Sequence, residues 1–145
     1  MQEILYGLKL NSSSTWVNNE TMIAGLGTDI IEVARISEKI GKESGFRELV
    51  FSAAEIAYCE PKANKYEHYA ARFAAKEAFF KALGTGWLNG TAFNEVEIAH
   101  DEKGKPFIRL LGETSTTIQG FGFLRIMVSM AHLKSIASAT VIIEQ

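Results

Sequence analysis

Cysteine and proline are scarce in this sequence. Its 145 residues include one cysteine, Cys59, and two prolines, Pro61 and Pro106. A single cysteine excludes an intramolecular disulfide, and no zinc-ligand cluster occurs at a known spacing, so we expect a protein of the reduced cytoplasm. The scarcity of proline leaves no proline-rich linker that would mark a second domain.

A surplus of basic residues and long apolar runs are also missing. The formal net charge is −2, which argues against a nucleic-acid binder that relies on a broadly basic surface. No apolar stretch approaches the roughly 18 residues that a membrane-spanning helix needs, so we expect no membrane insertion. With 47% hydrophobic and 22% charged residues, the chain fits one globular domain that buries its own core.

Residues 1–21 differ in composition from the rest of the chain. They contain two polar runs, at 11–15 and 18–20. They lack the basic start and the continuous apolar region of a secretory signal. We predict an upstream extension or leader at 1–21 and a single domain at 22–145.

The hydrophobic pattern predicts an α+β fold, in which a mostly antiparallel curved sheet packs against a long helix. We expect helices at 30–43, 46–50, 53–59, 65–83 and 113–119, and strands at 22–28, 93–100, 105–111, 123–130 and 137–144. Ser52 followed by Glu55 indicates a capping box. Gly104 suits a tight hairpin turn between two of the strands.

The most informative segment runs from Arg72 to Gly86. At about 100° per residue on a helix, Glu77 and Lys81 lie on one side, so both can reach a site near the helix end. Gly84-Thr85-Gly86 ends the helix and lets the backbone approach a ligand closely. The simpler alternative is an ordinary glycine cap after a solvated Glu–Lys pair, which contributes only about 0.3–0.5 kcal/mol.

A second carboxylate comes from Asp29, which follows an apolar strand pattern and precedes a helix pattern. Burying a carboxylate beside Thr28 and Ile30 is costly unless a cation or hydrogen-bond donors compensate it. Glu77 offers a second oxygen ligand, and two carboxylates with phosphate oxygens and water suit Mg²⁺. The sequence therefore predicts a metal site at Asp29 and Glu77.

Several segments together resemble the holo-(acyl-carrier-protein) synthases, which are small phosphopantetheinyl transferases. The matching segments are Gly27-Thr28-Asp29 with Arg35, Phe51 to Glu55, Arg72 to Gly86, Gly104-Lys105-Pro106, and Ser129 to His132. The resemblance implies transfer of 4′-phosphopantetheine from coenzyme A to a serine of apo acyl carrier protein, with release of adenosine 3′,5′-bisphosphate, in fatty acid biosynthesis. It also implies a homotrimer with active sites at the subunit interfaces.

The same resemblance assigns roles to individual residues. Asp29 and Glu77 would hold Mg²⁺ and Lys81 would add positive charge near the phosphates, so these three are the predicted catalytic residues. The predicted coenzyme A contacts are Arg72, Lys76, Lys81, Gly84, Thr85, Gly86, Ser129 and His132. A polar residue commonly follows the matching histidine in this family, whereas Leu133 stands there in this chain and Ala131 precedes the histidine. A non-catalytic coenzyme A or nucleotide-binding module is therefore the alternative function, and a purely structural oligomerisation domain is the third.

Two assignments stay open at this point. The acceptor of the serine proton could be a magnesium-bound water, Glu77 acting through water, or a group oriented by Asp29, and geometry must choose among them. His132 could contact a phosphate or be mainly structural. His68 and His100 match no motif and are interpreted as surface or packing residues.

A basic stripe is predicted on the helix after Asp29. Arg35, Lys39 and Lys42 fall within about 60° of each other by helix arithmetic. Because the carrier proteins of this family are strongly acidic, we expect the stripe to dock the carrier. A solvated face with mixed charges is the alternative.

Overall fold

The predicted α+β class is confirmed by a computed structural model, which describes residues 8–10, 16–18, 21–42, 45–86 and 88–145. The helices are α1 (Val33–Lys42), α2 (Phe46–Val50), α3 (Ala53–Cys59), α4 (Lys65–Leu83) and α5 (Gly112–Gln119), with a 3₁₀ helix η1 (Phe93–Glu95). The strands are β1 (Leu8–Leu10), β2 (Trp16–Asn18), β3 (Ile23–Glu32), β4 (Val96–His100), β5 (Pro106–Leu110), β6 (Arg125–His132) and β7 (Ile136–Glu144).

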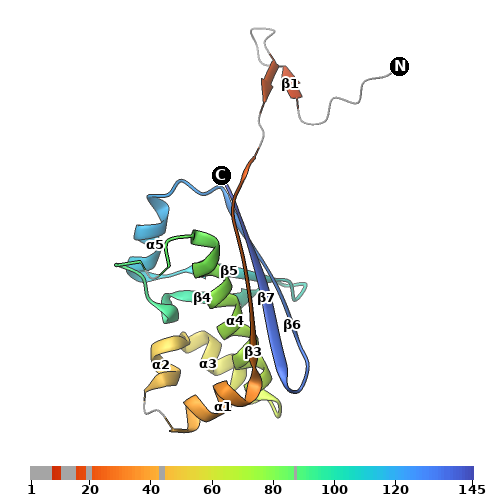
Figure 1. Cartoon of the computed structure of the whole chain (residues 1–145), viewed down its shortest axis with the longest axis vertical. Coiled ribbons are helices and arrows are strands. Elements are labelled where there is room, and N and C mark those ends of the chain that lie inside the picture. Colours follow the sequence, from red (N-terminus) through yellow and green to blue (C-terminus); the bar gives the residue numbers. More distant parts are fainter. Residues whose placement is uncertain (1–7, 11–15, 19–20, 43–44, 87) are drawn as a thin grey trace, which may run out of the picture.

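All strand pairs in the described part of the chain are antiparallel. The main sheet has the order β3-β7-β6, and β4-β5 and β1-β2 form separate two-stranded sheets. The extension or leader predicted at residues 1–21 lies mostly outside the described residues. In its described part, β1 pairs with β2. Figure 1 shows α4 beside the β3-β7-β6 sheet, with α1, α2 and α3 near one end of α4 and α5 near the other. None of the described helices combines the length and the apolar character that crossing a membrane requires.

Helix α4 lies very close to β3 because glycine occupies two positions that face it. A Cβ atom at Gly25 would meet the backbone carbonyl of Ala82, and one at Gly27 would meet that of Ala78. Side chains alternate along a strand, so Asp29 faces the same way as these two glycines. The close approach therefore brings the Asp29 carboxylate to the C-terminal half of α4.

The local signals in the sequence predict most element boundaries correctly. Ser52 Oγ accepts a hydrogen bond from the Glu55 backbone N–H at 3.2 Å, and the Ser52 N–H donates to Glu55 Oε2 at 2.8 Å, so the capping box is confirmed. The strand predicted from residue 93 was wrong at its start, because Phe93–Glu95 form η1 and β4 begins at Val96. The helix predicted from residue 30 was also wrong at its start. Strand β3 continues to Glu32 because its pairing with β7 extends to Ile136, and Asp29 therefore lies within the strand.

Candidate active site

Asp29, Glu77 and Lys81 come together where β3 passes the second half of α4. Lys81 Nζ donates to Asp29 Oδ1 at 2.7 Å and to the Thr28 carbonyl at 3.0 Å. Glu77 lies one helical turn before Lys81. Burial raises the pKa of the Glu77 carboxyl above its ordinary value, the charge of Asp29 raises it further, and Lys81 opposes both effects. The fold thus places the three residues predicted from the sequence in one electrostatic group.

The donor set of this group fits a magnesium ion. Asp29 and Glu77 are near enough for one charge to disfavour the other, and a bound cation relieves that repulsion. Mg²⁺ is usually held by one or two carboxylates, while substrate phosphates and water complete its octahedron. Among the described residues, no group of three or more His, Cys, Asp or Glu side chains could hold a metal. The two carboxylates therefore suit an ion that takes its other ligands from a substrate.

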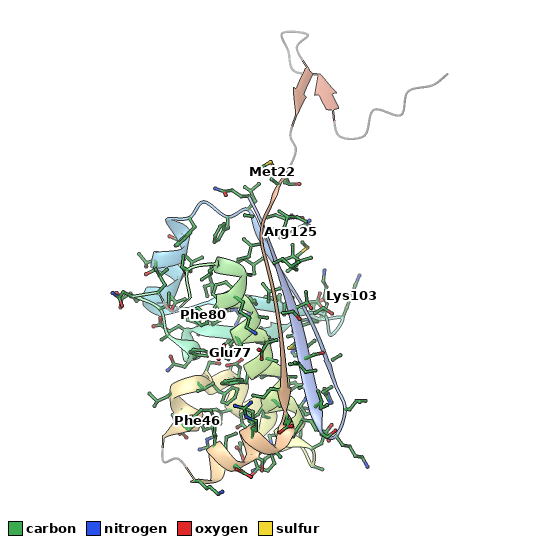
Figure 2. The ribbon with its side chains drawn as sticks, viewed as in Figure 1. Met22, Phe46, Glu77, Phe80, Lys103 and Arg125 are labelled. Carbon is green, nitrogen blue, oxygen red and sulfur yellow. The ribbon has the colours of Figure 1, made fainter. Side chains whose placement is uncertain are left out.

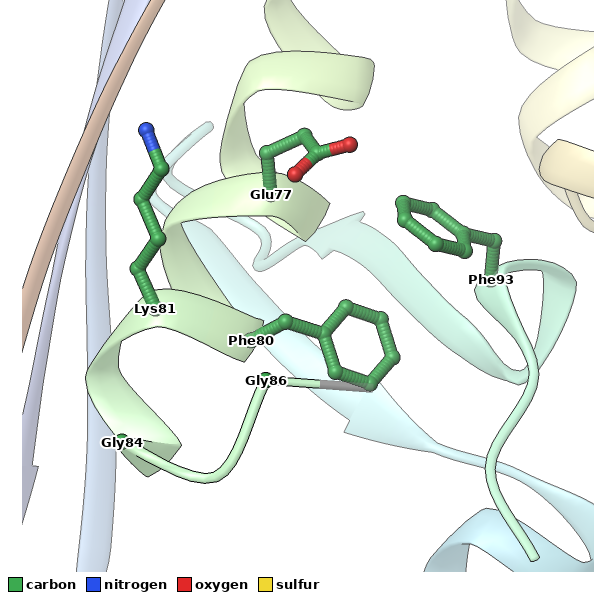
Figure 3. A pocket seen from close by; sticks show the side chains of 6 residues that line it. All are labelled: Glu77, Phe80, Lys81, Gly84, Gly86 and Phe93. Atoms are coloured by element: carbon green, nitrogen blue, oxygen red, sulfur yellow. The ribbon is translucent and has the colours of Figure 1, made fainter. Parts of the chain in front are cut away.

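A pocket of about 480 Å³ opens beside this group. It is lined by Glu77, Phe80, Lys81, Gly84, Gly86 and Phe93. Figure 3 shows Glu77, Phe80 and Phe93 around one space, whereas the Lys81 amine extends toward β3. Gly84 and Gly86 have φ angles of +72° and +66°, a backbone conformation that glycine adopts without steric cost. Thr85 lies between them, and its hydroxyl donates to the Gly86 carbonyl at 3.4 Å.

The two aromatic residues of the pocket were missed in the sequence. The Phe80 and Phe93 rings lie 4.9 Å apart between centroids, and Phe93 stacks on Phe73 with centroids 6.0 Å apart. The helical period indicates where Phe80 points along α4. No local signal, however, indicates that η1 returns to this helix and places Phe93 against it.

Lys76 does not reach this pocket, although the family resemblance predicted a coenzyme A contact for it. Its side chain is fully buried, and its ammonium group donates to Glu55 Oε2 at 2.7 Å, the Phe93 carbonyl at 2.8 Å and the Val96 carbonyl at 2.7 Å. All three N–H donors are therefore used inside the core, and none remains for a phosphate. The helical period placed Lys76 next to Glu77 but could not show that α3 and β4 cover its side of α4.

Arg72 lies in a second cluster, which also contains His132. The guanidinium carbon of Arg72 lies 4.1 Å from the centroid of the Tyr58 ring, and its Nη1 donates to the His68 carbonyl at 3.3 Å. The His68 and His132 ring centroids are 5.3 Å apart, and His132 Nδ1 lies 3.0 Å from Glu67 Oε2. The buried Arg72 Nε finds no hydrogen-bond partner in the part of the chain that the structure describes, an unusual state for a buried donor. One N–H of the Arg72 guanidinium is therefore buried in this cluster without an acceptor among the described residues.

Two histidines that the sequence left without a role belong to this cluster. The His100 ring stacks on Tyr58 with centroids 5.4 Å apart. Burial lowers the pKa of both His68 and His100, and the charge of Arg72 lowers it further. Their spacing in the sequence gave no signal because they come from α4 and β4, which only the fold brings together.

Ser129 is placed differently from the other predicted coenzyme A contacts. It lies exposed on β6 opposite Thr140 of β7, and Thr140 is opposite Thr28 of β3. Thr28 stands between Gly27 and Asp29, which face α4, and alternate residues of a strand point to opposite faces of the sheet. Thr28, Thr140 and Ser129 therefore lie on the face that points away from α4. Ser129 therefore does not line the Glu77 pocket.

The predicted basic stripe forms one surface of α1. Arg35, Glu38, Lys39 and Lys42 line a shallow groove of about 220 Å³. Lys42 Nζ lies 3.7 Å from Glu38 Oε2, and Lys39 Nζ lies 5.3 Å from the centroid of the Phe46 ring. The structure brings the three cations together, with one carboxylate among them, and their role stays a prediction.

Comparison with known proteins agrees with this site. The model of the 4′-phosphopantetheinyl transferase superfamily matches residues 25–123. A holo-[acyl-carrier-protein] synthase of Cytophaga hutchinsonii is 49% identical over 123 residues, which cover 83% of this chain and 97% of the relative. One of Ruminiclostridium cellulolyticum is 50% identical over 122 residues, which cover 81% and 90%.

Solved structures lead to the same assignment. The holo-[acyl-carrier-protein] synthase of Neisseria meningitidis has a TM-score of 0.78 at 32% identity, over 86% of this chain and 100% of that one. The enzyme of Bacillus anthracis, in complex with CoA (3′,5′-ADP), has a TM-score of 0.70 at 33% identity, over 86% and 98%. The resemblance found in the sequence is confirmed, and the chain belongs to the 4′-phosphopantetheinyl transferase superfamily.

Proposed function

We propose that this chain is a holo-[acyl-carrier-protein] synthase, which transfers 4′-phosphopantetheine from coenzyme A to a serine of apo acyl carrier protein for fatty acid biosynthesis. The transferase domain is placed at residues 22–145. The observation that carries the proposal is the group of Asp29, Glu77 and Lys81 beside a pocket with aromatic and glycine walls. Relatives that bear this name match most of the chain. A cytoplasmic location suits a chain with a single cysteine, Cys59, which is free and buried.

The reaction forms a bond between the serine oxygen and the β-phosphorus of coenzyme A and breaks the diphosphate bridge, so that adenosine 3′,5′-bisphosphate leaves. Asp29 and Glu77 would hold Mg²⁺, which when bound neutralises the charge that develops on the diphosphate. Lys81 uses two N–H donors on β3, and its half-exposed side chain can turn its third toward a phosphate oxygen. Phe80 and Phe93 give the pocket an apolar wall.

The proton of the carrier serine needs an acceptor near the pocket. Glu77 is the only carboxylate among the described residues that line the pocket, while Asp29 Oδ1 already accepts from Lys81. Glu77, acting through a water molecule, is therefore the protein's own candidate for this step.

Mass spectrometry of a cognate apo carrier tests the proposed function. Purified protein with coenzyme A and Mg²⁺ should add the mass of one phosphopantetheine group to the carrier, and chelation of the metal should stop the reaction. The alternative, a non-catalytic coenzyme A-binding module, is favoured by Ala131 and the exposed Leu133, since neither offers a side-chain hydrogen bond beside His132. Calorimetric binding of coenzyme A without transfer to any carrier would select this alternative and exclude the transferase.

The uncovered face of the main sheet supports the proposed homotrimer. Leu26 and Ile30 point away from α4 and are 67% and 69% exposed, which is costly for neighbouring apolar side chains of a monomer. Ser129 lies on the same face, so a nucleotide contact by Ser129 would join one subunit to the site of the next.

We expect Leu26→Glu to convert the trimer to monomers at micromolar concentration, because a charge would be buried at the interface without a partner. Sedimentation equilibrium measures the change. Leu49→Glu on α2 is the matched control, because Leu49 is 71% exposed and lies off this face. Equal molecular masses for both variants and the wild type would contradict the assignment of this face.

The stripe of Arg35, Lys39 and Lys42 is proposed to dock the acidic carrier. We expect the double reversal Lys39→Glu/Lys42→Glu to weaken carrier binding roughly tenfold at low salt, and less at high salt, because exposed charges are screened over about 10 Å at 0.1 M. Coenzyme A affinity should hardly change. Carrier affinity measured across a salt series provides the test.

Lys103→Glu is the control for this reversal, since Lys103 lies on the β4-β5 turn, far from α1 (Figure 2). A parallel loss of coenzyme A binding would place the stripe at the nucleotide site. An unchanged affinity for the carrier would contradict the docking role and favour the alternative, in which the stripe is only a solvated face of α1.

A further inference from the structure

We infer that Lys76 is a positioning residue that fixes the aromatic wall of the pocket and does not itself contact the substrate. The inference rests on the proposed function, because it takes coenzyme A to be the ligand of that wall. It concerns the lysine next to Glu77, for which the family resemblance implied a direct contact with coenzyme A.

The first support is where the three hydrogen bonds of Lys76 go. Phe93 begins η1, Val96 begins β4, and the ammonium group donates to the carbonyl of each, at 2.8 Å and 2.7 Å. The Val96 N–H also donates to the Phe93 carbonyl. Lys76 therefore holds both ends of a single 3₁₀ turn against the middle of α4.

The second support is what this turn carries. The Phe93 ring lies against Phe80, stacks on Phe73 and forms part of the pocket wall. Figure 3 shows this ring across the space from Glu77. Lys76 and Glu77 are consecutive on α4, so the backbone that carries Glu77 is tied to the backbone that carries Phe93. The separation between the two sides of the pocket is thus set through Lys76.

The third support is that the ammonium group is itself held in place. Glu55 is 1% exposed and accepts from Lys76 Nζ, from the Ser52 N–H at 2.8 Å and from the Ile98 N–H at 3.0 Å. A buried ammonium is tolerated when it is paired and fully hydrogen-bonded. Directional bonds of this kind fix a carbonyl in position and angle, whereas apolar packing alone allows it to slide.

The test compares Lys76→Met/Glu55→Gln with the wild type. Lys76→Met alone leaves a buried carboxylate without its cation and can fail to fold. The added Glu55→Gln removes that unpaired charge, and its one amide oxygen keeps an acceptor for either the Ser52 or the Ile98 N–H group. We expect the KM for coenzyme A to rise roughly fivefold with a smaller change in kcat, because Asp29, Glu77 and Lys81 remain in place. The half-saturating Mg²⁺ concentration should stay the same.

Phe93→Ala, made in both backgrounds, separates positioning from contact. If Lys76 acts through the aromatic wall, Phe93→Ala raises the KM for coenzyme A in the wild type. In the double variant the same substitution raises this KM by less than about twofold, because the Phe93 ring is already no longer held in place. If Lys76 contacted a phosphate, the two effects would multiply, and inorganic pyrophosphate would compete less well in a salt-dependent manner. That result would overturn the inference. Lys103→Met, at the exposed β4-β5 turn, controls for loss of one lysine.

A ligand-free measurement distinguishes failure of this inference from failure of the proposed function. Aromatic NMR signals of Phe80 and Phe93, assigned by substitution, should shift in Lys76→Met/Glu55→Gln and stay unchanged in Lys103→Met. Unchanged signals in the double variant would contradict the inference, even if the wild type transfers phosphopantetheine. Shifted signals in a protein that binds no coenzyme A would keep the positioning role and reject the function.

Discussion

Glu77→Gln should lower the rate of phosphopantetheine transfer at least about a hundredfold and leave the fold as stable as the wild type or slightly more stable. The loss is large because the substitution removes one of the two carboxylates proposed to hold the ion that neutralises the reacting diphosphate. Transfer rates at saturating and limiting Mg²⁺, together with urea denaturation, measure both parts of the prediction.

The stability part follows from the sign of the pKa shift. Burial, and then Asp29, raise the pKa of Glu77 above its unfolded value. A raised pKa means that folding favours the protonated carboxyl, so this stabilisation is complete below the unfolded pKa and is lost as the pH rises through the folded one. At neutral pH the ionised Glu77 therefore opposes folding, and a neutral amide removes that cost.

Glu102→Gln provides the control, because Glu102 is exposed on the β4-β5 turn. It should change neither the rate nor the stability. Near-normal transfer by Glu77→Gln at limiting Mg²⁺ would exclude Glu77 from the metal site, and a strongly destabilised variant would show that its role is structural.

Gly27→Ala should destabilise the protein by about 2–3 kcal/mol, near the upper part of the range for overpacked sites. The added Cβ would overlap the Ala78 carbonyl and crowd the backbone N of Ala82, and helix backbone cannot turn aside as a side chain can. Relief requires α4 to move off β3. Because Asp29 on β3 bonds Lys81 on α4, activity should fall together with stability.

Gly41→Ala is the matched control for this change. Gly41 lies in α1, where an added Cβ meets no atom of the described residues within 4 Å, and alanine is favoured over glycine in helices by about 0.5–1 kcal/mol. The urea concentration at the midpoint of unfolding should therefore fall in Gly27→Ala and rise in Gly41→Ala. Similar stability of the two would mean that the contact between α4 and β3 is loose.

The sequence by itself determined the features that depend on interactions between near neighbours. The bounds of α4 and the capping box at Ser52 follow from helical period and from bonds within one turn. The same period places Glu77 and Lys81 on one side of α4. The lone Asp29 indicated a need for a cation, and the fold supplies it from Lys81 at 2.7 Å.

Only the tertiary structure decided which charged residues face the pocket and which are covered. Lys76 and Lys81 flank Glu77 on one helix, yet one is fully buried by α3 and β4 and the other is half-exposed beside β3. Likewise, β3 extends to Glu32 because β7 continues to pair with it, and Phe93 joins the pocket because η1 packs on α4. A residue's surroundings depend on segments that are distant in the chain. The period of a helix or strand specifies in which direction a side chain points, but not which segment packs against it.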